Sequence, residues 1–474
     1  MVVATASVRE DIDAAMDNDG QLLASPAARG GDDEAFTIVR LPSHVHAQNK
    51  SLYEPRVVSV GPYHLGSGST RAMQGHKWRF LRDFLLRNAG DGGGGGGGGG
   101  GHLDACLREA RAVEARARRC YGEPLEMESD EFVQMLVLDG CFVLEFLLKW
   151  SESESGAAEL DAYMRWIWIY VYYDLLLVEN QIPFFVVAKL FNLAGGGGGA
   201  AAMGDDDDDA VDQRLLDLIY KFFSLHEPLC QVPAPSQLTV HHLLHLQYQR
   251  MVMPPERRST TSWLSSRQSA SPCNKYSIAD GATAATPLAI PCVTELQEFG
   301  VAFREKASPA SQFDVTFRGG TMEIPRLALS SGARILLANL LALEQTTGDW
   351  EGEGIVTSYL VLMNALVNTG ADVAVLQRRG VLDNMLSNEE AAAAFFNRLG
   401  GCALFDPRGH HYARLFAYAN EYRNHRWNRY IAVLKRDHLR TPCSIISLLA
   451  AATLLCISVM SAGFIICHYR HACS

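Results

Sequence analysis

Three histidines are the residues whose spacing could most readily support metal chemistry. In the pattern His241-His242-x-x-His245, His241 and His245 are four residues apart and would share one face of a helix, where two imidazoles could supply two metal ligands. No Cys-x-x-Cys or Glu-x-x-His pattern accompanies them, and leucines surround them. We therefore interpret these histidines as part of an ordinary amphipathic helix and predict no metal site.

Several acidic and aromatic residues are further candidates. The run Asp205–Asp209 offers carboxylate oxygens to a divalent cation, but its glycine and alanine flanks indicate a solvated loop. Asp139 and Glu179 lie within apolar helical patterns, where burial can turn a carboxyl group into a general acid. Such residues more often pair with arginine or with a backbone amide. Tyr63 and His64, after a Gly-Pro pair, fit either a ligand-facing loop or a turn packed on the core.

No established catalytic signature is present: the chain lacks a P-loop, a G-x-S-x-G elbow, an H-E-x-x-H motif and a strand-linked G-x-G-x-x-G. We therefore predict a protein that is not an enzyme, with no catalytic residue and no cofactor. The alternative is a membrane-anchored metal-dependent transferase or hydrolase that uses the histidine or aspartate cluster.

The amino-acid composition indicates a folded protein with free cysteines and disfavours nucleic-acid binding. The 474 residues carry a formal charge of −11, with 48% hydrophobic and 20% charged residues. This balance is typical of a packed core and disfavours nucleic acid as a partner. The 11 cysteines form no C-x-x-C pair, which indicates free thiols in a reducing compartment.

Hydrophobic periodicity predicts a mainly α-helical body with one small β-hairpin. The hairpin covers 313–324, where alternating apolar residues flank a Gly319-Gly320 turn and Phe317 faces Met322. Ser129 is expected to cap the helix that follows it, and Pro183 to begin another after a corner at 180–183. The expected helices are 76–85, 129–148, 166–178, 184–190, 333–343, 355–367 and 372–379. The apolar helix at 166–178 is expected to be buried in the core and not to span a membrane, because Asp174 interrupts it.

Low-complexity segments indicate where the folded body begins and where flexible insertions interrupt it. Residues 1–35 are predicted to be a disordered leader, and 36–436 a folded body. Glycine, alanine, serine and proline runs predict flexible insertions within this body. The insertions lie near 89–102, 194–210 and 253–289.

The C-terminal tail predicts a membrane anchor. Residues 445–467 contain no charged side chain, and as a helix they would extend about 34 Å, enough to cross a bilayer core of roughly 30 Å. A basic juxtamembrane segment, 437–444, precedes the span and a short tail, 468–474, follows it. Basic residues are more frequent before the span than after it, which favours a cytosolic body; an extracellular body is the alternative. Membrane lipid is thus one expected partner.

The order of several sequence blocks resembles a known plant family, the domain of unknown function 247. The blocks that carry the resemblance are Leu41-Pro42-Ser43-His44, Tyr53-Glu54-Pro55-Arg56, Val60-Gly61-Pro62-Tyr63-His64, His76-Lys77-Trp78, Leu138-Asp139-Gly140-Cys141-Phe142, Glu179-Asn180-Gln181-Ile182-Pro183-Phe184-Phe185, Thr294-Glu295-Leu296-Gln297-Glu298-Phe299 and Leu343-Glu344-Gln345. The likeness extends from about residue 37 to the C-terminus.

The resemblance implies a single C-terminal membrane helix and no established catalytic residue. Some grass members of this family are implicated in self-incompatibility as recognition determinants. We therefore expect a membrane-anchored plant protein that acts through interaction with an unidentified protein partner, in recognition or signalling.

Overall fold

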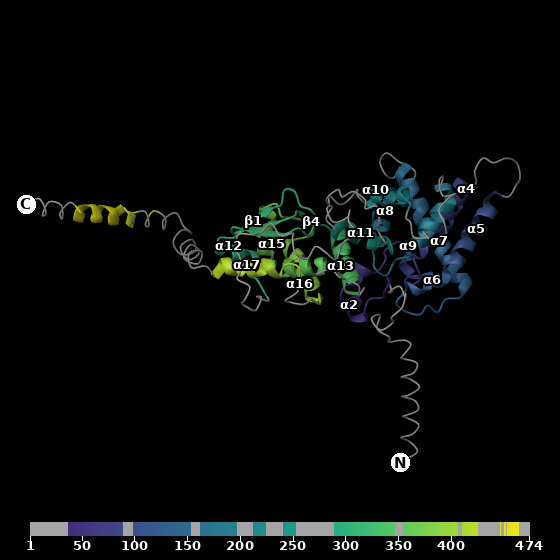
Figure 1. Cartoon of the computed structure of the whole chain (residues 1–474), viewed down its shortest axis with the longest axis horizontal. Coiled ribbons are helices and arrows are strands. Elements are labelled where there is room, and N and C mark those ends of the chain that lie inside the picture. Colours follow the sequence, from purple (N-terminus) through teal and green to yellow (C-terminus); the bar gives the residue numbers. More distant parts are fainter. Residues whose placement is uncertain are drawn as a thin grey trace, which may run out of the picture.

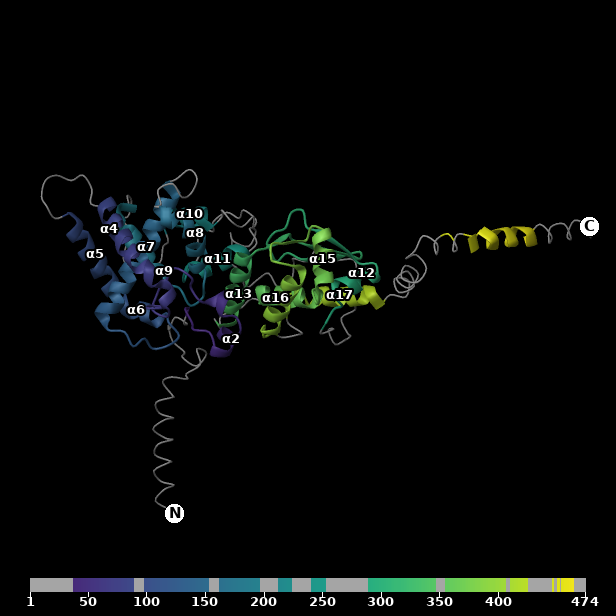
Figure 2. The ribbon, with the colours of Figure 1, turned by 180° about the vertical axis from the view of Figure 1, so that it is seen from behind.

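The computed structural model describes most of the predicted body and part of the tail. The described residues are 37–88, 98–152, 162–196, 212–223, 240–252, 289–346, 354–405, 410–424, 446, 450, 451 and 453–463. Figures 1 and 2 show two halves side by side, with the N-terminal helices around α7 at one end and the sheet-containing half at the other. Helix α13 lies between them. The predicted leader, 1–35, lies outside the described residues.

Helix α7, Ser129–Glu152, is the centre of the N-terminal half. It is buried almost all round from Phe132 to Leu147, because α4, α5, α9 and α10 all pack against it. The elements of this half are α2 (Ser43–Gln48), α3 (Lys50–Tyr53), η2 (Gly68–Thr70), α4 (Arg71–Asn88), α5 (Gly98–Ala112), α6 (Glu114–Arg119), α8 (Ala162–Asp174), α9 (Phe184–Phe191), η3 (Asn192–Gly196), α10 (Gln213–Phe223) and α11 (Leu243–Val252).

Two local expectations in this half need correction. Ser129 begins α7, but its hydroxyl donates to Glu114 Oε2 at 2.6 Å and does not cap the helix. The glycine run was expected to be entirely loop, yet Gly98–Gly101 form the first turn of α5. The following residues of α5 pack against α7 and α4, and this tertiary contact outweighs the poor helix propensity of glycine.

The prediction of one buried core helix at 166–178 is wrong in two respects. Helix α8 ends at Asp174, and Trp166 on its outer face is 76% exposed. The helix ends here because side-chain amides replace the next helical hydrogen bonds. Asn180 Nδ2 donates to Asp174 O at 2.8 Å, and Gln181 Nε2 donates to Leu175 O and Leu177 O, both at 2.8 Å.

The C-terminal half combines helices with two small sheets. Its described helices are α12 (Val293–Glu298), α13 (Ser331–Thr346), α14 (Ile355–Leu366), α15 (Gly370–Arg378), α16 (Glu389–Gly401) and α17 (Ala413–Asn424). Helices α13, α14 and α15 lie close to the predicted ranges, whereas α12, α16 and α17 were not predicted. Thr369 and Asp372 form a capping box that begins α15, and the Asn388 side chain caps α16.

The predicted hairpin is confirmed but belongs to a larger sheet. Strands β2 (Thr316–Arg318) and β3 (Thr321–Ile324) pair antiparallel, with Phe317 opposite Met322. Gly319 and Gly320 both have positive φ, at 56° and 81°, which the two-residue turn requires. A third strand, β1 (Ala302–Glu305), pairs parallel with β3 and was not predicted.

A second sheet was also missed. Strand β4 (Leu327–Leu329) pairs parallel with β5 (Leu382–Asn384), with Leu327 opposite Leu382. At the N-terminal end, Ile38 forms one parallel bridge with Tyr121. These short strands leave the described body mainly helical, and the fold class is confirmed at that level.

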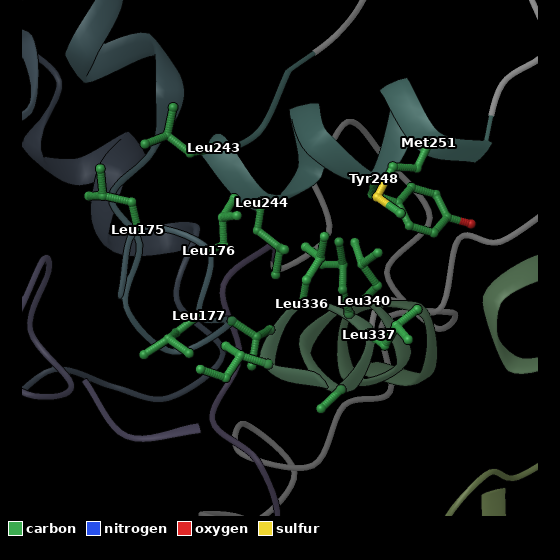
Figure 3. Close-up of a cluster of buried hydrophobic side chains, with 14 of the residues drawn as sticks. Leu175, Leu176, Leu177, Leu243, Leu244, Tyr248, Met251, Leu336, Leu337 and Leu340 are labelled. Carbon is green, nitrogen blue, oxygen red and sulfur yellow. The ribbon is translucent and has the colours of Figure 1, made fainter. Parts of the chain in front are cut away.

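The two halves share one hydrophobic core. Figure 3 draws leucines of the 175–177 segment, of α11 and of α13 in this core, with Leu244 of α11 directed toward Leu336 of α13. Leu176, Leu244 and Leu340 in this cluster are fully buried or nearly so. Burial of so much apolar surface at the junction stabilises one arrangement of the two halves.

The tail is described only in part. Within the described ranges, no single helix is both long and apolar enough to cross a bilayer; α14 and α15 reach that threshold only when taken together, across a 105° bend. Thr453–Gly463 form an apolar helix whose side chains are exposed. Of the remaining residues of the predicted span 445–467, only 446, 450 and 451 are described. The expected insertions are described only at their margins, so their inner parts lie outside the described residues.

Candidate functional site

An extended segment, 56–61, runs through the N-terminal half without a strand partner. Its backbone amides instead donate to buried side chains of α7, α8 and the corner that follows α8. Asp174 accepts from Val57 N at 2.7 Å and from Val58 N at 2.9 Å. Asn180 Oδ1 accepts from Val60 N at 2.7 Å. These bonds satisfy backbone groups that would otherwise be buried without partners.

A buried ion pair holds the end of this segment. Lys77 on α4 and Asp139 on α7 are both inaccessible to solvent, and Lys77 Nζ lies 2.5 Å from Asp139 Oδ1. The same ammonium donates to Ser59 O at 2.5 Å, while Asp139 Oδ2 accepts from Gly61 N at 2.9 Å. Burial raises the pKa of the Asp139 carboxyl above its ordinary value, and the Lys77 ammonium opposes that effect. The contacts of Asp139 are those of a structural residue.

Residues 179–183, the corner that follows α8, pack against the Gly61 end of the extended segment. Tyr121 OH donates to Gln181 O at 3.2 Å, and Gly61 packs against that carbonyl. Gly61 has φ of +83°, and a Cβ there would lie 2.3 Å from Gln181 O. Glycine is therefore required at this position for both conformation and space.

Glu179 also has structural partners. Its Oε1 accepts from Leu41 N at 2.6 Å, and its Oε2 lies 3.3 Å from His64 Nε2. Burial would raise the pKa of Glu179, but the contacts with His64 and the Leu41 amide outweigh burial and keep the pKa below its ordinary value. A depressed pKa is the opposite of what a general acid needs. Tyr63 packs edge-on against Tyr121 and donates to Ile38 O, so the Tyr63-His64 turn faces the core.

Two polar residues of α13 connect the halves and were not recognised as a pair in the sequence. Asn339 Nδ2 donates to Leu52 O at 2.8 Å, and its Oδ1 accepts from Val178 N at 2.9 Å. Glu344 accepts from Tyr248 OH at 2.8 Å and from Thr357 N at 2.6 Å. A single asparagine and a single glutamate within a leucine-rich helix were the available signal, since buried polar groups need partners.

Of the three histidines, His245 lies in the first turn of α11, while His241 and His242 precede the helix, and the three have different surroundings. His242 is buried with Nε2 at 3.0 Å from Thr37 O, and burial lowers its pKa to about 3. The rings of His241 and His245 stack with centroids 4.6 Å apart, and His245 Nδ1 accepts from His241 N. Within the ranges that the structure describes, no three His, Cys, Asp or Glu residues form a group that could hold a metal ion. Asp205–Asp209 lie outside those ranges.

The outer face of α8 exposes three large aromatic side chains. Tyr163, Trp166 and Tyr170 follow at helical spacing, and each is at least 40% exposed. Tyr163 stacks on His76 of α4, and the Arg56 guanidinium lies 6.0 Å from the Tyr170 ring centroid. We call these three residues the α8 aromatic face. Sequence reasoning missed it because the surrounding residues are apolar on every side.

The described cysteines are consistent with free thiols. Cys106, Cys120, Cys141 and Cys292 are buried, and Cys402 and Cys456 are more accessible; none of these six forms a disulfide.

The sequence is similar to known plant proteins over most of its length. Residues 38–457 match the model of the domain of unknown function 247 family, described as a plant protein of unknown function. The UPF0481 protein At3g47200 of Arabidopsis thaliana is 25% identical over 447 residues, covering 92% of this chain and 87% of the relative. The putative UPF0481 protein At3g02645 of the same plant is 21% identical over 502 residues, covering 90% and 89%. No solved structure matches. Since the family model covers most of the residues, the chain belongs to the plant family called domain of unknown function 247.

Proposed function

We propose that this protein acts through protein–protein interaction, in recognition or signalling, and that it is not an enzyme. The α8 aromatic face carries the proposal. Exposed tryptophan and tyrosine side chains are costly in water, and they are enriched where proteins bind one another. The candidate acids Asp139 and Glu179 support it as well, because backbone amides, a lysine and a histidine already occupy their oxygens.

We further propose that the C-terminal tail anchors the body to a membrane. The apolar helix Thr453–Gly463 lies within the uncharged segment 445–467, and its exposed leucine, isoleucine and valine side chains suit a lipid environment. The excess of basic residues before this segment favours a cytosolic body. The metal-dependent transferase or hydrolase gains no support from the histidine contacts, and we do not propose it.

Affinity capture from plant tissue tests the interaction. The full-length chain and its Trp166→Ala variant serve as baits, and Leu404→Ala is the matched control because Leu404 is 83% exposed in the other half. We expect a specific partner that the Trp166 variant loses and the Leu404 variant keeps. Equal capture by all three baits would contradict a role for the α8 aromatic face.

A further inference from the structure

The α8 aromatic face is supported at both ends and open in the middle. The Tyr163 ring stacks on the His76 ring of α4, with the centroids 4.9 Å apart and the planes inclined by 15°. The Arg56 guanidinium lies 6.0 Å from the centroid of the Tyr170 ring. Trp166, between the two tyrosines, is 76% exposed. Because neighbouring elements already hold the outer rings, the face has little side-chain entropy to lose when a ligand binds.

The three rings follow the axis of α8 at helical spacing. Trp166 comes three residues after Tyr163, and Tyr170 comes four residues after Trp166. At about 1.5 Å per residue, the two tyrosines are about 10.5 Å apart along the axis. One turn of a polyproline II helix covers three residues and advances about 9.3 Å. Residues i and i+3 of such a helix therefore reach the two tyrosines when the chain crosses Trp166.

The α8 aromatic face also offers three hydrogen-bond donors. In the part of the chain that the structure describes, the hydroxyls of Tyr163 and Tyr170 and the indole N–H of Trp166 make no hydrogen bond. A polyproline II segment has no internal hydrogen bonds, and its prolines carry carbonyl acceptors without N–H donors. The carbonyls of a bound α-helix, by contrast, are already used within that helix. The donors of this face are thus complementary to a proline-rich backbone.

We propose that the α8 aromatic face binds a proline-rich segment of a partner protein in the polyproline II conformation. Prolines of the segment pack on the rings of Tyr163 and Tyr170, and its carbonyls accept hydrogen bonds from Trp166 and the tyrosine hydroxyls. Aromatic side chains form the surfaces that bind P-x-x-P segments, whose conformation exists before binding. The inference names the partner class of the proposed interaction function and rests on that function.

A membrane surface and a second copy of the chain fit this face less well. Tryptophan and tyrosine are also enriched at membrane interfaces, but the whole chain has a formal charge of −11, so an anionic lipid surface would repel the body. Two α8 faces packed on each other would bring donors against donors, and the helical carbonyls of either copy are already bonded. A proline-rich segment supplies the carbonyl acceptors that both alternatives lack or offer less favourably.

Binding of fluorescein-labelled decaproline to the full-length chain, followed by fluorescence anisotropy, tests the inference. Trp166→Ala should weaken binding about tenfold or more, because it removes the central ring together with its donor. Tyr170→Phe keeps the ring and removes only the hydroxyl, so it should weaken binding about threefold. Trp78→Ala is the matched control: Trp78 is 49% exposed on α4, outside the α8 aromatic face, and its loss should leave binding unchanged. A decapeptide of alternating glycine and serine should not bind.

Thermal unfolding establishes that each variant is folded, and Tyr170→Phe decides the test if Trp166→Ala is not. Absence of decaproline binding, or equal affinity in all variants, would overturn the proposal. So would binding to phosphatidylcholine vesicles or dimerisation that depends on Trp166 in a chain that does not bind decaproline. A partner captured from plant tissue that Trp166→Ala loses, but that excess decaproline does not displace, would refute the proline-rich ligand and leave the interaction function standing.

Discussion

Breaking the Lys77–Asp139 pair should destabilise the protein in a way that depends on which partner is removed. In Lys77→Met, the Asp139 carboxyl stays buried without its cation and must take up a proton. Protonating a carboxyl group of ordinary pKa at pH 7 costs about 4 kcal/mol, at 1.36 kcal/mol for each pH unit above roughly 3.8. This agrees with the roughly 3–5 kcal/mol measured when one member of a buried pair is removed.

The pH dependence separates this reasoning from simple loss of packing. In Lys77→Met the native state holds a proton that the unfolded chain has released, so its stability deficit should shrink to about 2 kcal/mol at pH 5. In Asp139→Asn the buried Lys77 must lose its proton instead. The unfolded chain then binds the extra proton, so the deficit should grow as the pH falls from 7 to 5.

Urea denaturation of the purified chain at pH 7 and pH 5, followed by far-ultraviolet circular dichroism, measures both deficits. Lys50→Met is the matched control, because Lys50 forms an exposed pair with Glu54 at 3.3 Å and should contribute less than about 1 kcal/mol. Deficits that are equal for the two variants and independent of pH would refute the reasoning. The double variant Lys77→Met with Asp139→Leu should lose less than the sum of the single losses.

Three further predictions concern other parts of the structure. Burial raises the pKa of Asp174 to about 6. The native state therefore binds its proton more tightly than the unfolded chain, and this contribution to the free energy of unfolding should fall by about 2 kcal/mol as the pH rises from 4 to 6. Urea titrations of wild type and Asp174→Asn should show it as a slope in their difference, and a flat difference would count against it. Gly61→Ala should cost roughly 1–3 kcal/mol in thermal unfolding, because Gln181 O occupies the space of the new Cβ; an unchanged Tm would contradict this. Deletion of residues 441–474 should move the protein from the membrane to the soluble fraction without unfolding the body, and protease protection of the intact chain in sealed vesicles should show an accessible body if it faces the cytosol.

The sequence by itself determined the features that depend on neighbouring residues. Adjacent glycines with alternating apolar flanks determined the β2–β3 turn and its register, since only residues that tolerate positive φ form it. Pro183 determined the beginning of α9, because its fixed φ suits a first helical turn. Helical periodicity similarly placed α13, α14 and α15, whose apolar faces recur every three or four residues.

Only the tertiary structure decided the features that join distant residues. Lys77 and Asp139 are 62 positions apart, and no local pattern pairs them. Strands β4 and β5 have three residues each, too few for a period-two pattern, and their pairing depends on the helices that lie between them. Trp166 could not be assigned to the surface because α8 is apolar on all sides, so its exposed face depends on which sides other elements cover.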